Sequence, residues 1–414
     1  MKAIKNFFIK DKKKKPDYHW EKEGKDLLEK IKQKNYNKEE LKKVLSILLL
    51  KDVPKDFVTD FWLTCSGARE RMNQNKGQYQ KLVKAFNILV KNKHPFYLHL
   101  EKKISIDLNR SFNQSKINVT PEIINKLRDI LYAFAVRNVS INYCQGLNSI
   151  VAYILRMTNF KEEESFYLFL TLMENILPYD YYLFGLGVQA ELQVINILLE
   201  KYEPDITSYL NTLNGTIILY SVITQFVTSL LIFKINQNIS NILYNCFFGF
   251  ILLEDKDEVF YFFYKIIIGI FKLLKKDILK CKAMSQLKDA INLEKEFDKK
   301  SINSIKEYVL FEEGKDKLDS NYVKQLRIDE LNKIIKVNKC KFNFKNLDNI
   351  ECNIYYPMCI EEWNIDSSPS SNATYEKINS INNENNIINN EEDDEQILKD
   401  IIIERRQHYC KNNK

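Results

Sequence analysis

The segment ISIDLNRSF, residues 104–112, places Asp107 and Arg110 three positions apart, on one turn of a predicted helix. An arginine stays charged and presents a planar fork of donors that matches phosphate oxygens. The same spacing also describes an ordinary surface ion pair, which contributes less than about 1 kcal/mol. On spacing alone, the surface ion pair is the better interpretation.

A second polar group interrupts an apolar pattern at NYCQG, where Tyr143 and Gln145 precede Gly146 and a helix predicted over residues 147–155. A glutamine amide donates to a phosphate oxygen and accepts from water at the same time. The alternative is a plain turn with a glutamine near a helix start. Together, an arginine and a glutamine would supply charge neutralisation and water positioning, which are the two needs of phosphoryl transfer.

Motifs for chemistry carried by the chain itself are missing from the sequence. It contains no GxxxxGK[ST], GxGxxG, HExxH or GxSxG motif, and its four histidines show no triad or metal spacing. The loose cluster Cys340, Cys352 and Cys359 lacks a CxxC pair and a nearby histidine, so free thiols are a better interpretation than zinc. We expect this chain to hold no cofactor and no metal.

Helical periodicity dominates the segments that must position these groups. Apolar residues recur at intervals of three and four, and no segment of comparable length alternates with period two. Asn37 is placed as an N-cap, Pro54 suits a first helical turn and Gly67 suits a C-cap. The pattern predicts an all-α fold with helices packed through apolar stripes. The clearest stripes are Ile123, Leu127, Ile130, Leu131 and Phe134, then Leu147, Ile150, Val151 and Ile154, then Phe166, Phe169, Leu170, Met173 and Leu177.

One apolar stretch raises the question of a membrane span. No charged residue lies between Asp205 and Lys234, and GTIILYSVITQFVTSLLIF is long enough to cross a bilayer. Its serines, threonines and glutamine recur too often for a comfortable lipid-facing surface, and amphipathic helices flank it. We therefore expect a helix buried in a large core, with a transmembrane helix as the alternative.

Charge and composition narrow the classes of function. Of the formal net charge of +7, residues 1–15 supply seven lysines and one aspartate, so the rest is nearly neutral and argues against a nucleic-acid partner. Those lysines are able to attract an anionic membrane surface, with a solvated tail as the alternative.

Eight scattered cysteines indicate a reducing compartment. Residues 366–414, rich in Asn, Ser and acidic residues, are predicted to be disordered.

The two polar motifs together resemble the paired IxxDxxR and YxQ signatures of the TBC domain, the catalytic domain of Rab GTPase-activating proteins. VPKDFVTDFWLTCSGA is similar to the opening of that domain, ESFYLFLTLMENILPYDYY to its middle, and NILYNCFFGFILLEDKDEVFYFFYKIII to its later helices. The resemblance covers about residues 52–280. It implies an all-helical fold, with a soluble, buried helix at residues 215–233.

The resemblance also implies a role for each motif residue. Arg110 would be an arginine finger that enters the active site of a Rab GTPase, and Gln145 would be supplied in trans to position the attacking water. The residues implied to support them are Ile104, Asp107, Tyr143 and Gly146. The aspartate would orient the guanidinium, and the tyrosine and glycine would shape the glutamine's loop, although plain core packing explains the tyrosine equally well. GTP and Mg²⁺ would come with the GTPase.

Several positions depart from the family pattern. Asp52 replaces the glycine of the usual opening, and Val58 lies where an arginine commonly precedes the tryptophan that is Trp62 here. Tyr244 and Asn245 stand in place of a frequent Trp-Asp pair. These are packing or orienting positions, so we expect them to affect local geometry and the choice of GTPase more than the chemistry.

On this resemblance we expect a GTPase activator that acts in trans on a Rab-type GTPase and regulates vesicle trafficking. A non-catalytic TBC scaffold that binds a small GTPase or trafficking partner is the alternative. Either would be cytoplasmic, with transient visits to endomembrane surfaces. The expected organisation is a basic leader with N-terminal helices (1–51), the TBC domain (52–315), a helical extension (316–365) and the disordered tail (366–414).

Overall fold

The computed structural model describes residues 18–112, 118–139, 141–311 and 317–342. All regular elements in these ranges are helices, and the only β pairing there is an isolated bridge between Ile235 and Leu293. The all-α prediction is therefore confirmed. The basic residues 1–15 and the tail 366–414 lie outside the described residues, so the membrane contact and the disorder expected of them stay predictions.

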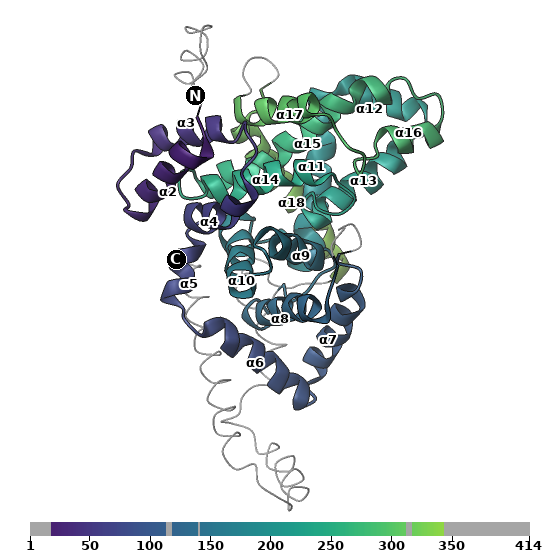
Figure 1. Ribbon diagram of the computed structural model, residues 1–414. Coiled ribbons are helices and arrows are strands. Elements are labelled where there is room, and N and C mark those ends of the chain that lie inside the picture. Colours follow the sequence, from purple (N-terminus) through teal and green to yellow (C-terminus); the bar gives the residue numbers. More distant parts are fainter. Residues whose placement is uncertain (1–17, 113–117, 140, 312–316, 343–414) are drawn as a thin grey trace, which may run out of the picture.

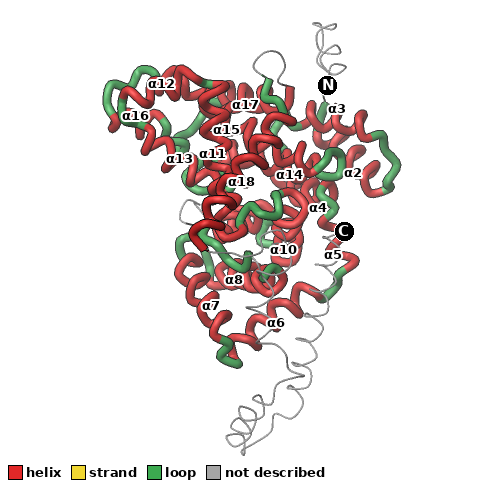
Figure 2. The backbone as a smooth tube through the Cα atoms, turned by 180° about the vertical axis from the view of Figure 1, so that it is seen from behind, coloured by secondary structure: helices red, strands yellow, loops and turns green. Residues whose placement is uncertain are grey.

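The helices follow one another along the whole described chain, and Figures 1 and 2 show them from two sides. The first half contains η1 (Trp20–Gly24), α2 (Lys25–Lys32), α3 (Lys38–Leu48), α4 (Lys55–Cys65), α5 (Ala68–Gln74), α6 (Gln78–Lys91), α7 (Pro95–Leu108), α8 (Pro121–Arg137), α9 (Leu147–Met157) and α10 (Glu162–Thr171). The second half contains η2 (Leu172–Ile176), η3 (Leu183–Gly185), α11 (Leu186–Tyr202), α12 (Pro204–Thr212), α13 (Thr216–Ser229), α14 (Gln237–Phe250), α15 (Lys256–Ile278), α16 (Met284–Ala290), α17 (Lys299–Phe311) and α18 (Ser320–Phe342). η1 and η2 are π-helical turns, and η3 is a 3-10 turn.

The predicted N-cap at Asn37 is confirmed, and Pro54 and Gly67 each lie one residue from their predicted positions at the ends of α4. The Asn37 side chain accepts a hydrogen bond from the Glu40 amide at 3.1 Å, which satisfies one of the free donors at the start of α3. Pro54 is the N-cap of α4, one residue before the predicted first turn. Gly67, with a φ of +74°, separates α4 from α5, in the left-handed conformation that glycine favours at a helix end.

The molecule tapers from a broad upper end to a narrow lower end in Figure 1. Helices α6, α7 and α8 form the lower end, α11 to α17 form the upper end, and α9 and α10 lie between them. Seen from behind, α18 lies along the middle of the molecule, where it packs against α11 (Figure 2). Of the two predicted motifs, the first lies at the end of α7 and the second directly before α9, so they lie in the lower and central parts.

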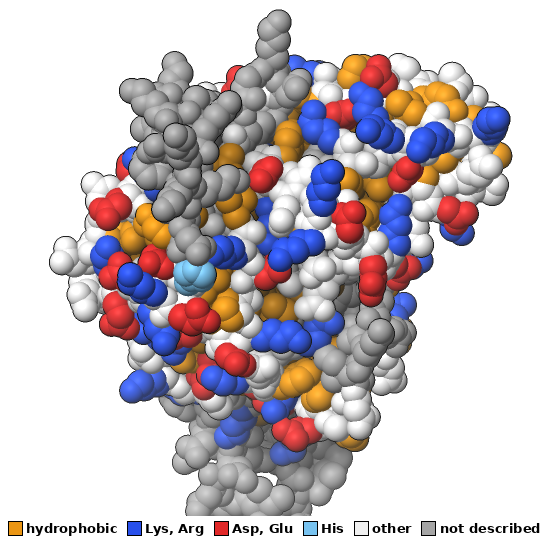
Figure 3. Space-filling model, turned by 45° about the horizontal axis from the view of Figure 1, so that its top comes forward, with side chains coloured by type: hydrophobic (Ala, Val, Ile, Leu, Met, Phe, Trp, Pro, Cys, Tyr) orange, Lys and Arg blue, Asp and Glu red, His pale blue; other side chains and the backbone are white. Residues whose placement is uncertain are grey.

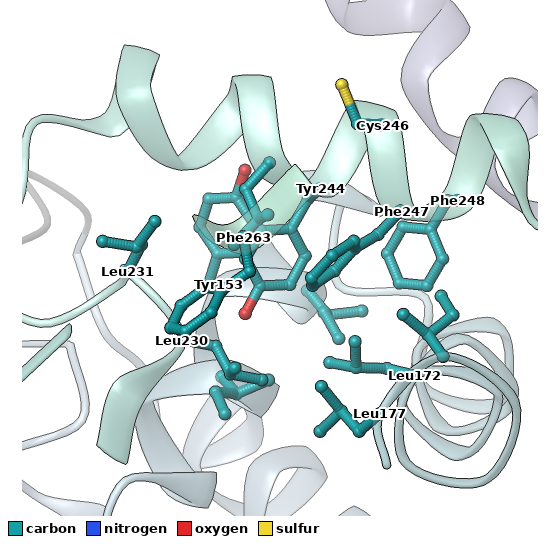
Figure 4. Packing of buried hydrophobic residues seen from close by; sticks show 14 of the residues in the cluster. Tyr153, Leu172, Leu177, Leu230, Leu231, Tyr244, Cys246, Phe247, Phe248 and Phe263 are labelled. Atoms are coloured by element: carbon teal, nitrogen blue, oxygen red, sulfur yellow. The ribbon is translucent and has the colours of Figure 1, made fainter. Parts of the chain in front are cut away.

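A continuous aromatic core joins α4, α9 and α14. Trp62 is fully buried, with its ring centroid 5.0 Å from that of Phe248, and the centroids of Tyr153 and Tyr244 are 4.7 Å apart. Figure 4 shows Tyr153 and Tyr244 side by side in this cluster. Because large apolar side chains contribute about 1.5–3 kcal/mol each on burial, these contacts fix α9 firmly behind the loop that precedes it.

The departures from the family pattern at Val58, Tyr244 and Asn245 lie in or beside this core, whereas Asp52 is exposed and pairs with Lys306 at 2.7 Å. Val58 is 3% exposed and Tyr244 is fully buried, so both are packing positions. Asn245 accepts a hydrogen bond from the indole nitrogen of Trp62 at 2.8 Å. An amide oxygen thus provides an acceptor for the buried indole at this position.

The uncharged stretch is not one long helix. It is divided between α12 and α13, and no helix of the described ranges has both the length and the apolar character needed to cross a bilayer. The expectation of a buried helix is wrong for one face of α13, because Ile217 is 77% and Tyr220 38% exposed. Leu219, Ile223 and Phe226 bury the opposite face, so the helix is only half-covered.

Helices on both sides of the predicted TBC domain pack onto the same body. Trp20 of η1 lies with its ring centroid 5.1 Å from Phe61 of α4, and α18 contacts α11 and α15. The boundaries at residues 51/52 and 315/316 stay predictions. On the face shown in Figure 3, lysine, arginine, aspartate and glutamate side chains are interspersed around small apolar patches.

Candidate functional site

The first motif occupies the last turns of α7 and the turn that follows it. Ile104 is fully buried and anchors the helix to the core, and Asp107 is 4% exposed one turn later. Arg110 lies just beyond the helix, with its side chain 48% exposed. The motif therefore runs from an apolar anchor through a buried carboxylate to a cation at the surface.

Asp107 and Arg110 form an ion pair within this turn. A guanidinium nitrogen of Arg110 contacts Oδ1 of Asp107, and the Arg110 amide donates to the Asp107 carbonyl at 3.3 Å. The Asp107 side chain is only 6% exposed, which excludes the ordinary surface ion pair considered from the sequence. A buried carboxylate needs its partners, because an uncompensated buried charge is strongly destabilising. The pair holds the guanidinium at the surface in one orientation.

Tyr143 contacts the other oxygen of the same carboxylate. Its hydroxyl donates to Oδ2 of Asp107 at 2.5 Å, and its side chain is buried. Burial and the hydrogen bond to Asp107 raise the pKa of Tyr143 far above its ordinary value, so the hydroxyl remains a donor. Tyr143 is thus part of the core and also has a polar contact. One carboxylate binds both motifs, one on each oxygen.

The loop after Tyr143 presents Gln145 to solvent. Gln145 is exposed and has no hydrogen-bond partner among the residues that the structure describes. Gly146 follows with a φ of +110°, and a Cβ atom there would lie 2.3 Å from the Thr228 carbonyl oxygen. Only glycine fits this close approach. The loop is thus held on both sides of Gln145, whose side-chain amide is exposed.

A second link between the motifs was not predicted from the sequence. Asn148 is 3% exposed, and its amide donates to the Ser111 hydroxyl at 2.9 Å and to the Asp107 carbonyl at 3.4 Å. The Ser111 hydroxyl donates to that carbonyl at 2.7 Å, and Asn148 Oδ1 accepts from the Gly146 amide at 3.2 Å. The available signal was a lone asparagine in the apolar helix start LNSIVAYIL.

This arrangement has a limited chemical repertoire. It offers an oriented guanidinium and an exposed amide, which are donors suited to a phosphoryl group and its attacking water. Within the described ranges, no group of three His, Cys, Asp or Glu side chains is placed to hold a metal ion. Both side chains are exposed, so another molecule can reach them.

The segment that contains both motifs matches a known protein family. A family model described as the Rab-GTPase-TBC domain matches residues 55–279, just over half of the chain. The chain belongs to this TBC family. The motifs at Asp107–Arg110 and Tyr143–Gln145 both lie within the matched segment.

Relatives with curated descriptions carry the same domain name. Growth hormone-regulated TBC protein 1 of Homo sapiens is 33% identical over 167 residues, which cover 39% of this chain and 46% of that protein. TBC1 domain family member 2A of Homo sapiens is 31% identical over 239 residues, which cover 57% of this chain and 24% of that protein. In both cases the match spans less than half the length of the relative.

Two solved structures show the TBC fold. The Chlamydomonas flagellar RabGAP TBC domain aligns with a TM-score of 0.52 at 17% identity, over 73% of this chain and 97% of that one. The Ypt/Rab-GAP domain of Gyp1p aligns with a TM-score of 0.55 at 13% identity, over 68% of this chain and 97% of that one. The predicted family and fold are confirmed, and the roles of the individual site residues stay predictions.

Proposed function

We propose that this TBC protein accelerates GTP hydrolysis by a Rab-type GTPase, with Arg110 and Gln145 supplied in trans. The observation that supports this proposal most directly is the shared carboxylate of Asp107. It holds Arg110 on one oxygen and, on the other, Tyr143, two residues before Gln145. The buried Asp107 thus supports both the exposed guanidinium of Arg110, a cation, and the loop that carries the exposed amide of Gln145.

The chemistry follows from what a small GTPase lacks. Its own hydrolysis is slow because charge on the transferring phosphoryl group is poorly neutralised and the attacking water is poorly held. The guanidinium of Arg110 would neutralise that charge, and the amide of Gln145 would hold the water. An arginine finger typically contributes about 10³–10⁵ in rate, or about 4–7 kcal/mol of barrier. GTP and Mg²⁺ come with the GTPase.

The test is single-turnover GTP hydrolysis by a panel of Rab GTPases, with the wild-type chain and the variants Arg110→Ala and Gln145→Ala. Matched controls are Arg69→Ala, an arginine of α5 paired with Asp60, and Gln80→Ala, an exposed glutamine of α6. We expect at least one Rab to be accelerated, with most of the effect lost in the two site variants and kept in the controls. Failure to accelerate any Rab would overturn the proposal.

The alternative is a TBC scaffold that binds a small GTPase without activating it, and the changed accessory positions Val58, Tyr244 and Asn245 motivate it. Both site residues that activation needs are present, which favours catalysis. A Rab that binds the protein but hydrolyses GTP at its unassisted rate would establish the scaffold instead. Under either function, the protein would act in the cytoplasm, visit endomembrane surfaces where Rabs reside and regulate vesicle trafficking.

A further inference from the structure

Glu174 is a single charged residue within the apolar run SFYLFLTLMENILP. It lies in η2, the π-helical turn that continues α10, and its side chain is 10% exposed. π-helical turns are rare and frequently occur at functional sites. A buried glutamate in such a turn needs a reason, because an unpaired carboxylate in a protein interior is costly.

Two arginines and an amide surround this carboxylate. Arg137 donates to Oε1 at 2.8 Å and to Oε2 at 3.3 Å, Asn138 donates to Oε1 at 3.4 Å, and the guanidinium of Arg71 contacts Oε2. Burial alone would raise the pKa of Glu174, but Arg137 and Arg71 outweigh burial and lower it to about 2. The carboxylate is therefore ionised at neutral pH and binds the end of α8 to η2.

From this cluster, backbone and side-chain hydrogen bonds lead toward the loop of Gln145. Arg137 is the last residue of α8, and the carbonyl of Asn138 accepts from the Asn142 amide at 2.6 Å. Asn142 has a φ of +46°, and its Oδ1 accepts from the Tyr143 amide at 2.6 Å. Of the described residues of this loop, 138–139 and 141–146, Asn138 contacts Glu174, Tyr143 contacts Asp107 through its hydroxyl, and Gly146 meets Thr228.

We propose that Glu174 is a positioning residue for Gln145. It fixes the start of the loop at Asn138, while the Gly146 contact fixes its end, so the side-chain amide of Gln145 is presented at a defined place. This inference rests on the proposed function of Gln145. A glutamate that only stabilises the fold would affect the whole molecule rather than this loop.

The test compares Glu174→Gln with Glu191→Gln. Glu191 is fully buried and bound to an arginine, Arg327, at 2.6 Å, in another cluster that α11, α15 and α18 form with Asp180. Single-turnover hydrolysis by a responding Rab is measured at saturating activator in the wild-type, Gln145→Ala and Arg110→Ala backgrounds. Asn138→Ala is a milder variant, because it removes one donor and leaves the charges in place.

We expect Glu174→Gln to lower the rate about ten- to a hundredfold in the wild-type background, because small displacements of a catalytic group have effects of this size. In the Gln145→Ala background it should have no further effect, since the positioned group is gone. In the Arg110→Ala background it should lower whatever stimulation remains. Asn138→Ala should show the same pattern more weakly, and Glu191→Gln should affect all backgrounds alike.

An equal loss in the Gln145→Ala background, or no loss in any background, would overturn the inference. Hydrogen exchange of residues 138–146 provides a readout that does not depend on activity: it should accelerate in Glu174→Gln and not in Glu191→Gln. If Arg110→Ala and Gln145→Ala leave hydrolysis unchanged, the proposed function fails, and the exchange result still decides whether Glu174 holds this loop. Unchanged exchange there would refute the positioning role.

Discussion

At the scale of single residues, the carboxylate of Asp107 has two contacts, and the loss of either one affects the other. The guanidinium of Arg110 and the hydroxyl of Tyr143 each bind one of its oxygens. Because the side chain is 6% exposed, water cannot readily take the place of a lost donor. Removing one contact therefore leaves a buried charge less well compensated and also loosens the other motif.

The variant Tyr143→Phe tests this coupling with a minimal change. It removes the hydroxyl and keeps the ring, so we expect the free energy of unfolding to fall by about 1.5–3 kcal/mol, as for hydrogen bonds to charged groups. Urea titration measures this loss, and the rate at which the protein stimulates GTP hydrolysis by a responding Rab should fall with it. Tyr153→Phe is the control, because that equally buried tyrosine donates to the neutral amide of Asn241 at 2.7 Å. Equal losses in the two variants would contradict the prediction.

Glu174 predicts a pH dependence of stability with a definite sign. Its pKa in the folded protein is about 2, below its ordinary value of 4.5, so its contribution is present above pH 4.5 and is lost as pH falls toward 2. A depression of this size corresponds to about 3 kcal/mol. Urea unfolding between pH 6 and pH 3 should show a flatter pH dependence for Glu174→Gln than for wild type. Parallel curves would show that the carboxylate does not contribute in this way.

At the scale of elements, the loop of Gln145 depends on the approach of α13. Gly146 has a φ of +110°, and the Thr228 carbonyl occupies the place where a Cβ atom would be. The hydroxyl of Tyr182 donates to that carbonyl at 3.0 Å, so the carbonyl itself is held in position. The loop, α13 and the segment before η3 therefore meet at one backbone oxygen.

Gly146→Ala should consequently destabilise the protein more than an alanine at another glycine with positive φ. Gly185 is the matched control, since its φ is +72° and a Cβ atom there would meet no other side chain or backbone segment within 4 Å. Unfavourable φ alone costs about 1–2 kcal/mol, and the overlap with Thr228 adds to this in Gly146→Ala only. Thermal unfolding of the two variants measures the difference. A smaller loss for Gly146→Ala would show that the loop moves away without cost.

The same elements show what sequence patterns could and could not predict. Spacing of three and four indicated the helices, and motif resemblance indicated the sites of Arg110 and Gln145. The pattern could not show that α13 has one open face, because its exposed side carries Ile217 and Tyr220 and no charge that would mark it. Nor could it pair Asp107 with Tyr143, which lie 36 residues apart. Glu174 was missed because a lone glutamate in a helix usually faces solvent.

At the scale of the whole molecule, the site is supported from far along the chain. Asp107, Gly146 and Thr228 come from three segments, and the aromatic core of α4, α9 and α14 lies behind the second motif. The family model ends at residue 279, yet α17 packs on α15, and Arg327 of α18 binds Asp180 at 2.9 Å. Helices outside the matched segment thus contribute to the body that positions the site.

The shared carboxylate of Asp107 also has an evolutionary consequence. In a site whose two active groups are held separately, loss of activity proceeds through independent steps, and each intermediate keeps part of the function. Here one substitution at Asp107 would release Arg110 and Tyr143 together. Under the proposed function, a descendant of this protein could therefore lose activity in a single mutation, with Arg110 and Gln145 still present in its sequence.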